Sequence, residues 1–61
     1  MKIKKHKEID GYDYIRVEAR KGNVVFVADG RIKQCASRSM QAKMILELRK
    51  AITTLFQANG L

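Results

Sequence analysis

The sequence predicts an α+β fold in which a three-stranded antiparallel meander packs on one C-terminal amphipathic helix, in the order β-β-β-α. Three observations lead to this prediction. A long apolar stripe with helical spacing lies near the C-terminus, three shorter stretches before it have strand-like patterns, and turn signals that contain glycine separate them. The chain has 61 residues, enough for one domain. We expect that domain over residues 12–61, behind a basic N-terminal arm of residues 1–11.

The N-terminal arm is rich in lysine and has little apolar pattern. Apolar residues alternate only at Met1 and Ile3, and a charged run follows them. We expect an arm that can pair briefly as a strand. A mobile basic arm can follow a phosphate backbone, whereas the alternative is an ordinary solvated tail. Its candidate nucleic-acid contacts are Lys2, Lys4, Lys5 and Lys7.

Residues 12–20 alternate between apolar and polar side chains, the pattern of a half-buried strand. Ile15, Val17 and Ala19 share the predicted inner face. Tyr14, Arg16 and Arg20 share the other face, where tyrosine can stack on a base and arginine can contact phosphate. A turn is expected at residues 21–23, because Gly22 and Asn23 are typical turn residues.

Residues 24–28 are β-branched and aromatic, which predicts the central strand with Phe26 pointing inward. Val25 and Val27 then point outward. Asp29-Gly30 predicts a hairpin, because a type I′ turn needs positive φ and glycine adopts it best. Residues 31–36 then form the third strand, with Arg31, Lys33 and Cys35 on its outer face.

The strongest pattern predicts a helix from Ser39 to Gln57, because its apolar residues recur every three or four positions. Ser37 or Ser39 can be the N-cap, since a hydroxyl oxygen accepts hydrogen bonds from the free amides of the first turn. Asn59-Gly60 provides the left-handed stop. Leu46 lies on the polar side of this helix and is a candidate contact for a partner. The apolar stripe consists of Met44, Ile45, Leu48, Ala51, Ile52, Leu55 and Phe56.

Composition favours some classes of function over others. A single cysteine excludes an intrachain disulfide, and Cys35 with His6 is too small a set for a metal site, so we expect no metal and no cofactor. No phosphate loop, carboxylate pair or Ser/His/Asp set is present, which disfavours an enzyme. The sequence contains neither a membrane-length apolar run nor a secretory signal core, so we expect a cytoplasmic protein without membrane contact.

The net charge of +7, from 13 Lys and Arg against 6 Asp and Glu, favours a polyanionic partner. The predicted open sheet face surrounds Val25 and Val27 with basic residues, and Arg38 adds a cation at the start of the helix. Nucleic acid fits this surface. The alternatives are that the charge only keeps the chain soluble, and that the valines form the seam of a homodimer, which would relieve the small core of so short a chain.

Residues 30–43, GRIKQCASRSMQAK, resemble the last strand and helix start of the arm-type DNA-binding domains of tyrosine recombinases, relatives of the plant AP2 domain. The resemblance implies three strands and a helix, with DNA contact through Arg16, Arg20, Arg31 and Lys33. The chain departs from this pattern where Cys35-Ala36 replaces the usual aromatic residue, and no catalytic domain follows in the sequence. Double-stranded RNA-binding domains have a similar strand-to-helix passage, so duplex RNA stays open.

Two functional hypotheses follow. The first is a small basic nucleic-acid-binding protein, a regulator or accessory factor that contacts DNA in preference to RNA through its sheet face and arm. The second is a small interaction protein of phage or mobile-element type that modulates a host protein through Val25, Val27 or Leu46 without touching nucleic acid. Either one can be a homodimer.

Overall fold

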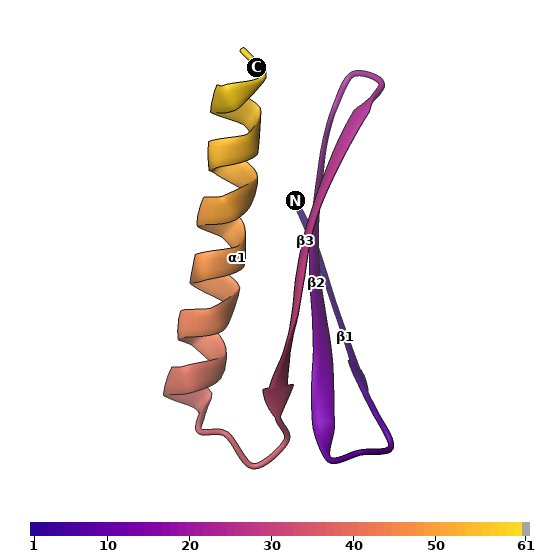
Figure 1. The fold of residues 1–61 in the computed structure, drawn as a ribbon, viewed down its shortest axis with the longest axis vertical. Helices are drawn as coiled ribbons and strands as arrows, with labels where there is room; N and C mark the ends of the chain where they lie inside the picture. Colours follow the sequence, from indigo (N-terminus) through magenta and orange to yellow (C-terminus); the bar gives the residue numbers. More distant parts are fainter. Residues whose placement is uncertain (61) are drawn as a thin grey trace.

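The computed structural model describes residues 1–60 and contains one sheet and one helix (Figure 1). Strands β1 (Lys2–Lys7), β2 (Tyr12–Lys21) and β3 (Val24–Lys33) precede helix α1 (Arg38–Ala58). The strands are antiparallel, in the spatial order β1-β2-β3, so the prediction that residues 24–28 form the central strand is wrong: β2 is central and β3 is an edge strand. The predicted β-β-β-α fold is therefore confirmed. Leu61, the last residue of the predicted domain, lies outside the described residues.

The first strand comes from the segment predicted to be an arm. β1 pairs along its whole length with β2, from Lys2 opposite Glu18 to Lys7 opposite Asp13. The turn that follows is closed by a 2.7 Å hydrogen bond from the Glu8 amide to the Tyr12 carbonyl. This pairing satisfies backbone groups on one edge of β2 that would otherwise need water. The lysine-rich segment is thus held in the sheet and is not a free arm.

The predicted hairpin at Asp29-Gly30 is wrong, because β3 runs straight through these residues. Gly30 pairs with Ile15 of β2, and its φ is not positive. A methyl group on Gly30 would meet Cε at the flexible end of the Met44 side chain, so the glycine leaves room for Met44 of α1 to pack over the strand. The separate third strand predicted at residues 31–36 is therefore wrong too. Its first residues belong to β3, and the others lie in the connection to α1.

Other local signals are confirmed. The turn at residues 21–23 connects β2 and β3, with Gly22 at a φ of 61°. Ser37 is the N-cap of α1, and its hydroxyl accepts a hydrogen bond from the Met40 amide. The helix ends one residue beyond the prediction, and Gly60 follows with a φ of 71°.

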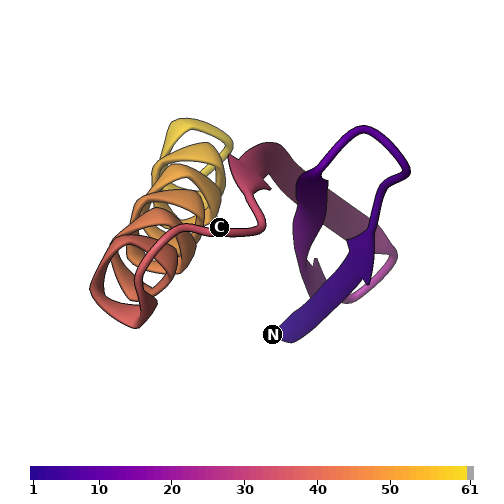
Figure 2. The ribbon, with the colours of Figure 1, turned by 90° about the horizontal axis from the view of Figure 1, so that it is seen from below.

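The core lies between α1 and the inner face of β2 and β3. Ile15, Val17 and Ala19 of β2 and Ile52 of α1 are buried. Phe26 and Phe56 meet edge to face above them, with ring centroids 4.9 Å apart. The backbone of α1 lies alongside β3 and β2 but not β1, which is farther away (Figure 2). One face of the sheet is therefore uncovered, as the sequence predicted. Within residues 1–60, no helix has both the length and the apolar character needed to cross a membrane.

Candidate nucleic-acid interface

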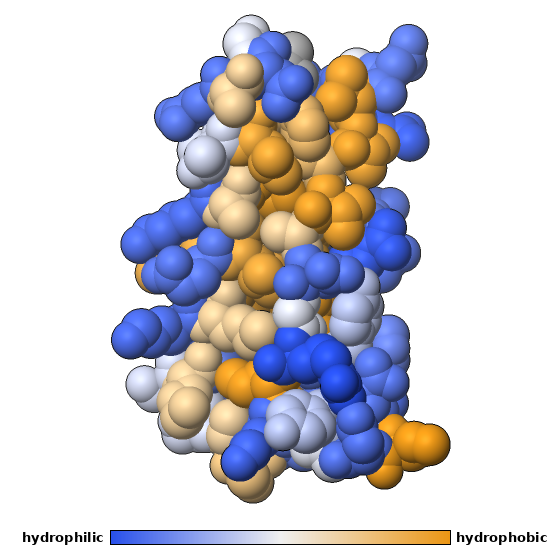
Figure 3. Space-filling model, viewed as in Figure 1, coloured by the Kyte–Doolittle hydropathy of each residue, from blue (hydrophilic) through white to orange (hydrophobic). Residues whose placement is uncertain are grey.

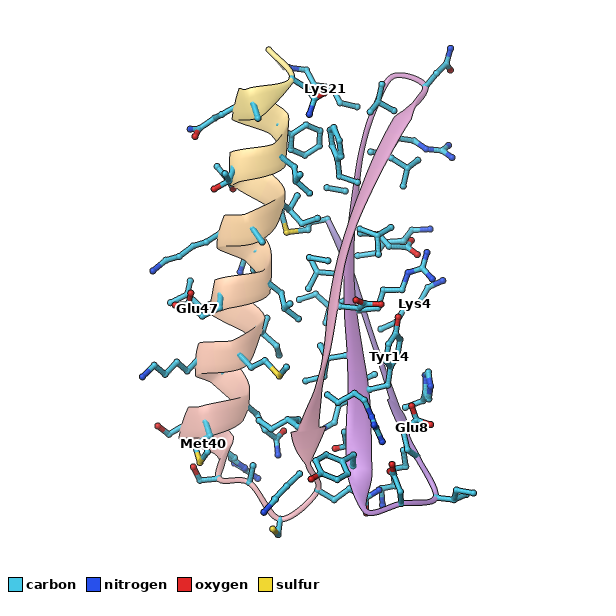
Figure 4. The ribbon with its side chains drawn as sticks, viewed as in Figure 1. Lys4, Glu8, Tyr14, Lys21, Met40 and Glu47 are labelled. Carbon is cyan, nitrogen blue, oxygen red and sulfur yellow. The ribbon has the colours of Figure 1, made fainter. Side chains whose placement is uncertain are left out.

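The candidate interface is the face of the sheet turned away from α1, called the outer face below. Directly opposed residues of antiparallel strands share a face, so the register gives its membership. Lys4 and Tyr14 project on this side (Figure 4). The outer face consists of Lys2, Lys4 and His6 from β1, Tyr12, Tyr14, Arg16, Glu18 and Arg20 from β2, and Val25, Val27, Asp29, Arg31 and Lys33 from β3.

The register arranges these side chains in rows across the three strands, and the rows are predominantly basic. The middle row is Lys4, Arg16 and Asp29. Six lysines and arginines stand against two carboxylates on the whole face, a net charge of +4 with His6 neutral. Seven of the ten candidate nucleic-acid residues lie here, namely Lys2, Lys4, Tyr14, Arg16, Arg20, Arg31 and Lys33.

Glu18 pairs with two of the cations. Its Oε1 lies 2.8 Å from Arg16 Nε and 3.9 Å from Lys4 Nζ. The Arg16 N–H does not point at this oxygen, so the contact is an ion pair and not a hydrogen bond. The pair holds the arginine near the centre of the face and leaves its terminal nitrogens as donors.

Tyr14 is fixed by a carboxylate from the neighbouring strand. Its hydroxyl donates a 2.7 Å hydrogen bond to Asp29 Oδ2, and this bond raises the pKa of the phenol above its ordinary value. The ring of His6 lies against Tyr14 with centroids 4.9 Å apart. Tyr14 therefore stays a neutral hydrogen-bond donor at neutral pH, with a fixed ring at the surface.

Arg31 is held at the end of the face nearest the β1–β2 turn. Its guanidinium bonds the carboxylate of Asp10 and stacks 4.9 Å from the ring centroid of Tyr12. The hydrogen bond lowers the pKa of Asp10 and raises that of Arg31. Sequence reasoning missed Asp10 and Asp29 as organisers of the site, because it placed one in an arm and the other in a hairpin turn.

Three cations of the outer face have no carboxylate partner among residues 1–60: Lys2, Arg20 and Lys33. Lys2 and Arg20 lie toward the β2–β3 turn, and Lys33 lies at the opposite end of β3. The unpaired positive charge is therefore distributed at both ends of the face, while the cations between them are paired.

The other predicted contacts lie elsewhere. Lys5 points to the α1 side, where its Nζ is 3.4 Å from Oδ2 of the buried Asp13 and donates a 3.1 Å hydrogen bond to Gln41. Lys7 shares that side, and Arg38 starts α1. The register therefore places Lys5 and Lys7 on the other side of the sheet from the outer face. Lys5 instead joins β1 to the helix.

The apolar candidates are exposed on different elements. Val25 is 45% and Val27 37% exposed on the outer face, while Leu46 is 50% exposed on α1. A shallow hollow lies beside Val25, lined by Met1, Lys2, Glu18, Ala19, Arg20 and Val25. Cys35 lies in the connection before α1 and not on the outer face where the sequence had placed it. Within residues 1–60, no three His, Cys, Asp or Glu side chains are close enough to hold a metal ion together.

Comparisons with known proteins found no relative of this chain. The chain matches no family model, no curated protein and no solved structure.

Proposed function

We propose that this chain is a small cytoplasmic nucleic-acid-binding protein that contacts duplex DNA through its outer face and acts as a regulator or accessory factor. The observation that supports the proposal is the register. It collects six cations and two tyrosines from three strands on the one face that α1 leaves open. Such a concentration of positive charge favours a polyanion.

The dimensions of the sheet are compatible with a DNA groove. Strands about 4.8 Å apart place the backbones of β1 and β3 about 10 Å from each other, and the major groove is about 12 Å wide. The resemblance of residues 30–43 to arm-type DNA-binding domains supports the same mode of contact. In this arrangement Lys2, Arg20 and Lys33 bind phosphates, while Arg16 and Arg31 approach base edges.

The proposal is tested by fluorescence anisotropy with labelled duplex DNA, single-stranded DNA and duplex RNA, using nuclease-treated protein. Four phosphates neutralised by Lys2, Lys4, Arg20 and Lys33 give a slope of log K against log salt of about −3.6. We expect duplex DNA to bind most tightly and with a steep salt dependence. A salt-independent signal, or no binding at low salt, would contradict the proposal.

Matched variants separate the outer face from net charge. Replacing Lys2, Arg20 and Lys33 together by alanine removes three phosphate contacts, so the slope should fall by about 3. Replacing Lys43, Arg49 and Lys50 of α1 by alanine removes the same charge from another surface and should leave the slope nearly unchanged. Equal effects of both triple variants would show that DNA binding depends on the net charge of the protein and not on the outer face.

A second candidate function is binding of a host protein through the exposed Val25 and Val27 beside their shallow hollow. The double substitution Val25→Lys, Val27→Lys distinguishes the two functions. It adds positive charge and should preserve or strengthen DNA binding, whereas binding of a protein through this apolar patch should be lost. Loss of DNA binding on this substitution would place the valines in the DNA contact itself.

A further inference from the structure

The two edges of the sheet differ in how they are protected against pairing with another strand. β1 carries four lysines in six residues, and lysine on an edge strand discourages such pairing. β3 is ten residues long, contains no proline, and has no cation between Val24 and Gly30. Within residues 1–60 it pairs only with β2, so its other edge presents free backbone N–H and C=O groups. An exposed edge of this kind is a site of strand addition.

The position of α1 favours an added strand beside β3. A helix centred on three strands would lie over β2, but α1 lies over β3 and β2. Met44 of α1 contacts Gly30 of β3, so the side of the helix that carries Met44, called the flank below, lies toward the free edge of β3. Apolar surface runs between α1 and β3 along the length of the molecule (Figure 3). The side of α1 next to the free edge of β3 thus has apolar surface that could cover a strand from another chain.

The flank has a spacing typical of helix pairs. Residues at intervals of four and three form a line along α1: Met40, Met44, Glu47, Ala51, Thr54 and Ala58. The long side chains lie toward the N-terminus of the helix and the small ones toward its C-terminus. Met40 and Glu47 project from α1 without reaching the sheet (Figure 4). An antiparallel copy of this flank would place large side chains against small ones, the arrangement that fills space between helices.

The edge of β3 is complementary to itself in the same way. If Ala28 is opposite Ala28 of a second copy in antiparallel register, Phe26 is opposite the copy's Gly30, and Val24 is opposite the copy's Ile32. The apolar inner faces are then continuous. Strands about 4.8 Å apart would set the two helices about 10 Å apart, which is a normal packing distance. The register therefore joins both layers at once.

Surface area and charge favour a second copy over other occupants. The chain exposes 4624 Å², and a monomer of its mass exposes about 4,000 Å². The surplus is about 600 Å² per chain, so a pair has about 1,200 Å² available, the lower limit for specific interfaces. The molecule measures 38 × 20 × 14 Å, and its longest direction runs along the strands and the helix. The other groove beside α1 is lined by Arg49 and Lys50, where two copies would repel.

We propose that two copies of this chain associate through the free edge of β3, with antiparallel β3 strands forming one six-stranded sheet and the two α1 helices packing side by side across the two-fold axis. This dimer differs from the valine-seam dimer considered from the sequence, because the outer faces of both copies stay open on the same side of the joined sheet. It does not depend on nucleic-acid binding.

Sedimentation velocity over about 10 to 500 µM protein, at about 0.15 M salt to screen the charge, tests the association. We expect the mass to rise from 7.0 kDa toward twice that value. In the proposed register Ala51 is opposite Glu47 of the other copy, so Ala51→Glu places like charges in the helix contact and should weaken association at least about tenfold. Ala51 is exposed in the single chain, and glutamate is a good helix former, so the variant should fold. Gln57→Glu adds the same charge on the far side of α1 and should associate normally.

A cross-link tests the register. In a Cys35→Ser background, the double variant Met40→Cys, Ala58→Cys should form a disulfide-linked dimer on mild oxidation, because Met40 of each copy is opposite Ala58 of the other. Met40→Cys alone should not, since the two copies of this residue are at opposite ends of the helix pair. A wild-type chain that stays monomeric throughout, equal association of Ala51→Glu and wild type, or no cross-link in the double variant would overturn the proposal.

Discussion

Ile52 is the only fully buried side chain of α1, so truncating it tests whether the helix stabilises the domain through this contact. Ile52→Ala removes three carbon atoms, worth about 2.4 kcal/mol at about 0.8 kcal/mol each, and the cavity that remains adds to the loss. We expect a destabilisation of about 3–4 kcal/mol. A domain of this length has about 3–9 kcal/mol in total, so the variant should lose a third or more of the stability and be largely unfolded if the total is near the lower end.

The assay is urea unfolding followed by far-ultraviolet circular dichroism at one fixed protein concentration, because association would shift the midpoint. Ile52→Val, with an expected cost of about 0.5–1.5 kcal/mol, gives a measurable transition if the alanine variant does not fold. Leu46→Ala is the control, since Leu46 is half exposed and should cost less than about 0.5 kcal/mol. The reasoning is refuted if Leu46→Ala costs as much as Ile52→Ala, or if Ile52→Val costs nothing.

Three further predictions concern polar contacts. Ser37→Ala removes the N-cap acceptor of α1 and should destabilise the protein by about 0.5–2 kcal/mol in the same urea assay, with Ser37→Asp restoring most of the loss. Asp29→Asn should lower the raised pKa of Tyr14, measured by NMR titration; an unchanged pKa would show that the carboxylate is not its cause. Because the folded protein holds the phenol protonated, the Tyr14 hydrogen bond stabilises the fold fully below pH 10.0. This stabilisation is lost as pH rises through the raised pKa. The pKa of Asp10 is lowered by Arg31, so the Asp10 carboxylate should stabilise the fold above its ordinary pKa of 3.8. This stabilisation should be lost as pH falls through the lowered pKa. Asp10→Asn should therefore flatten this acid-dependent drop in melting temperature, and an equal drop in both proteins would disprove the assignment.

The hairpin error shows what a local signal leaves open. Asp29-Gly30 is a typical turn pair, but glycine also occurs in strands where a side chain of a neighbouring element packs closely over the backbone. Met44 closes over Gly30, and this contact joins residues fourteen positions apart in the chain. Nothing in the residues around Gly30 distinguishes the two uses. The distinction depends on where α1 lies.

The candidate site was partly predictable for a related reason. Alternation alone placed Tyr14, Arg16 and Arg20 together, because successive side chains of a strand point to opposite faces. The lysines of β1 could not be assigned in the same way while their segment was taken for an arm. Pairing with β2 divides them, with Lys2 and Lys4 on the outer face and Lys5 beside Asp13. The ion pairs that fix Arg16 and Arg31 likewise follow from register and turn geometry.

By itself, the sequence determined the class of fold, the helix with its apolar stripe and Ser37 cap, and the turn at Gly22, because each depends on periodicity or on backbone preferences within a few residues. Only the tertiary structure decided that residues 2–7 are a strand, that β3 continues through Gly30, and which carboxylate holds which arginine. It also left β3 with a free edge beside an apolar helix flank. These features arise from contacts between distant segments, whose geometry is set by packing α1 on β2 and β3.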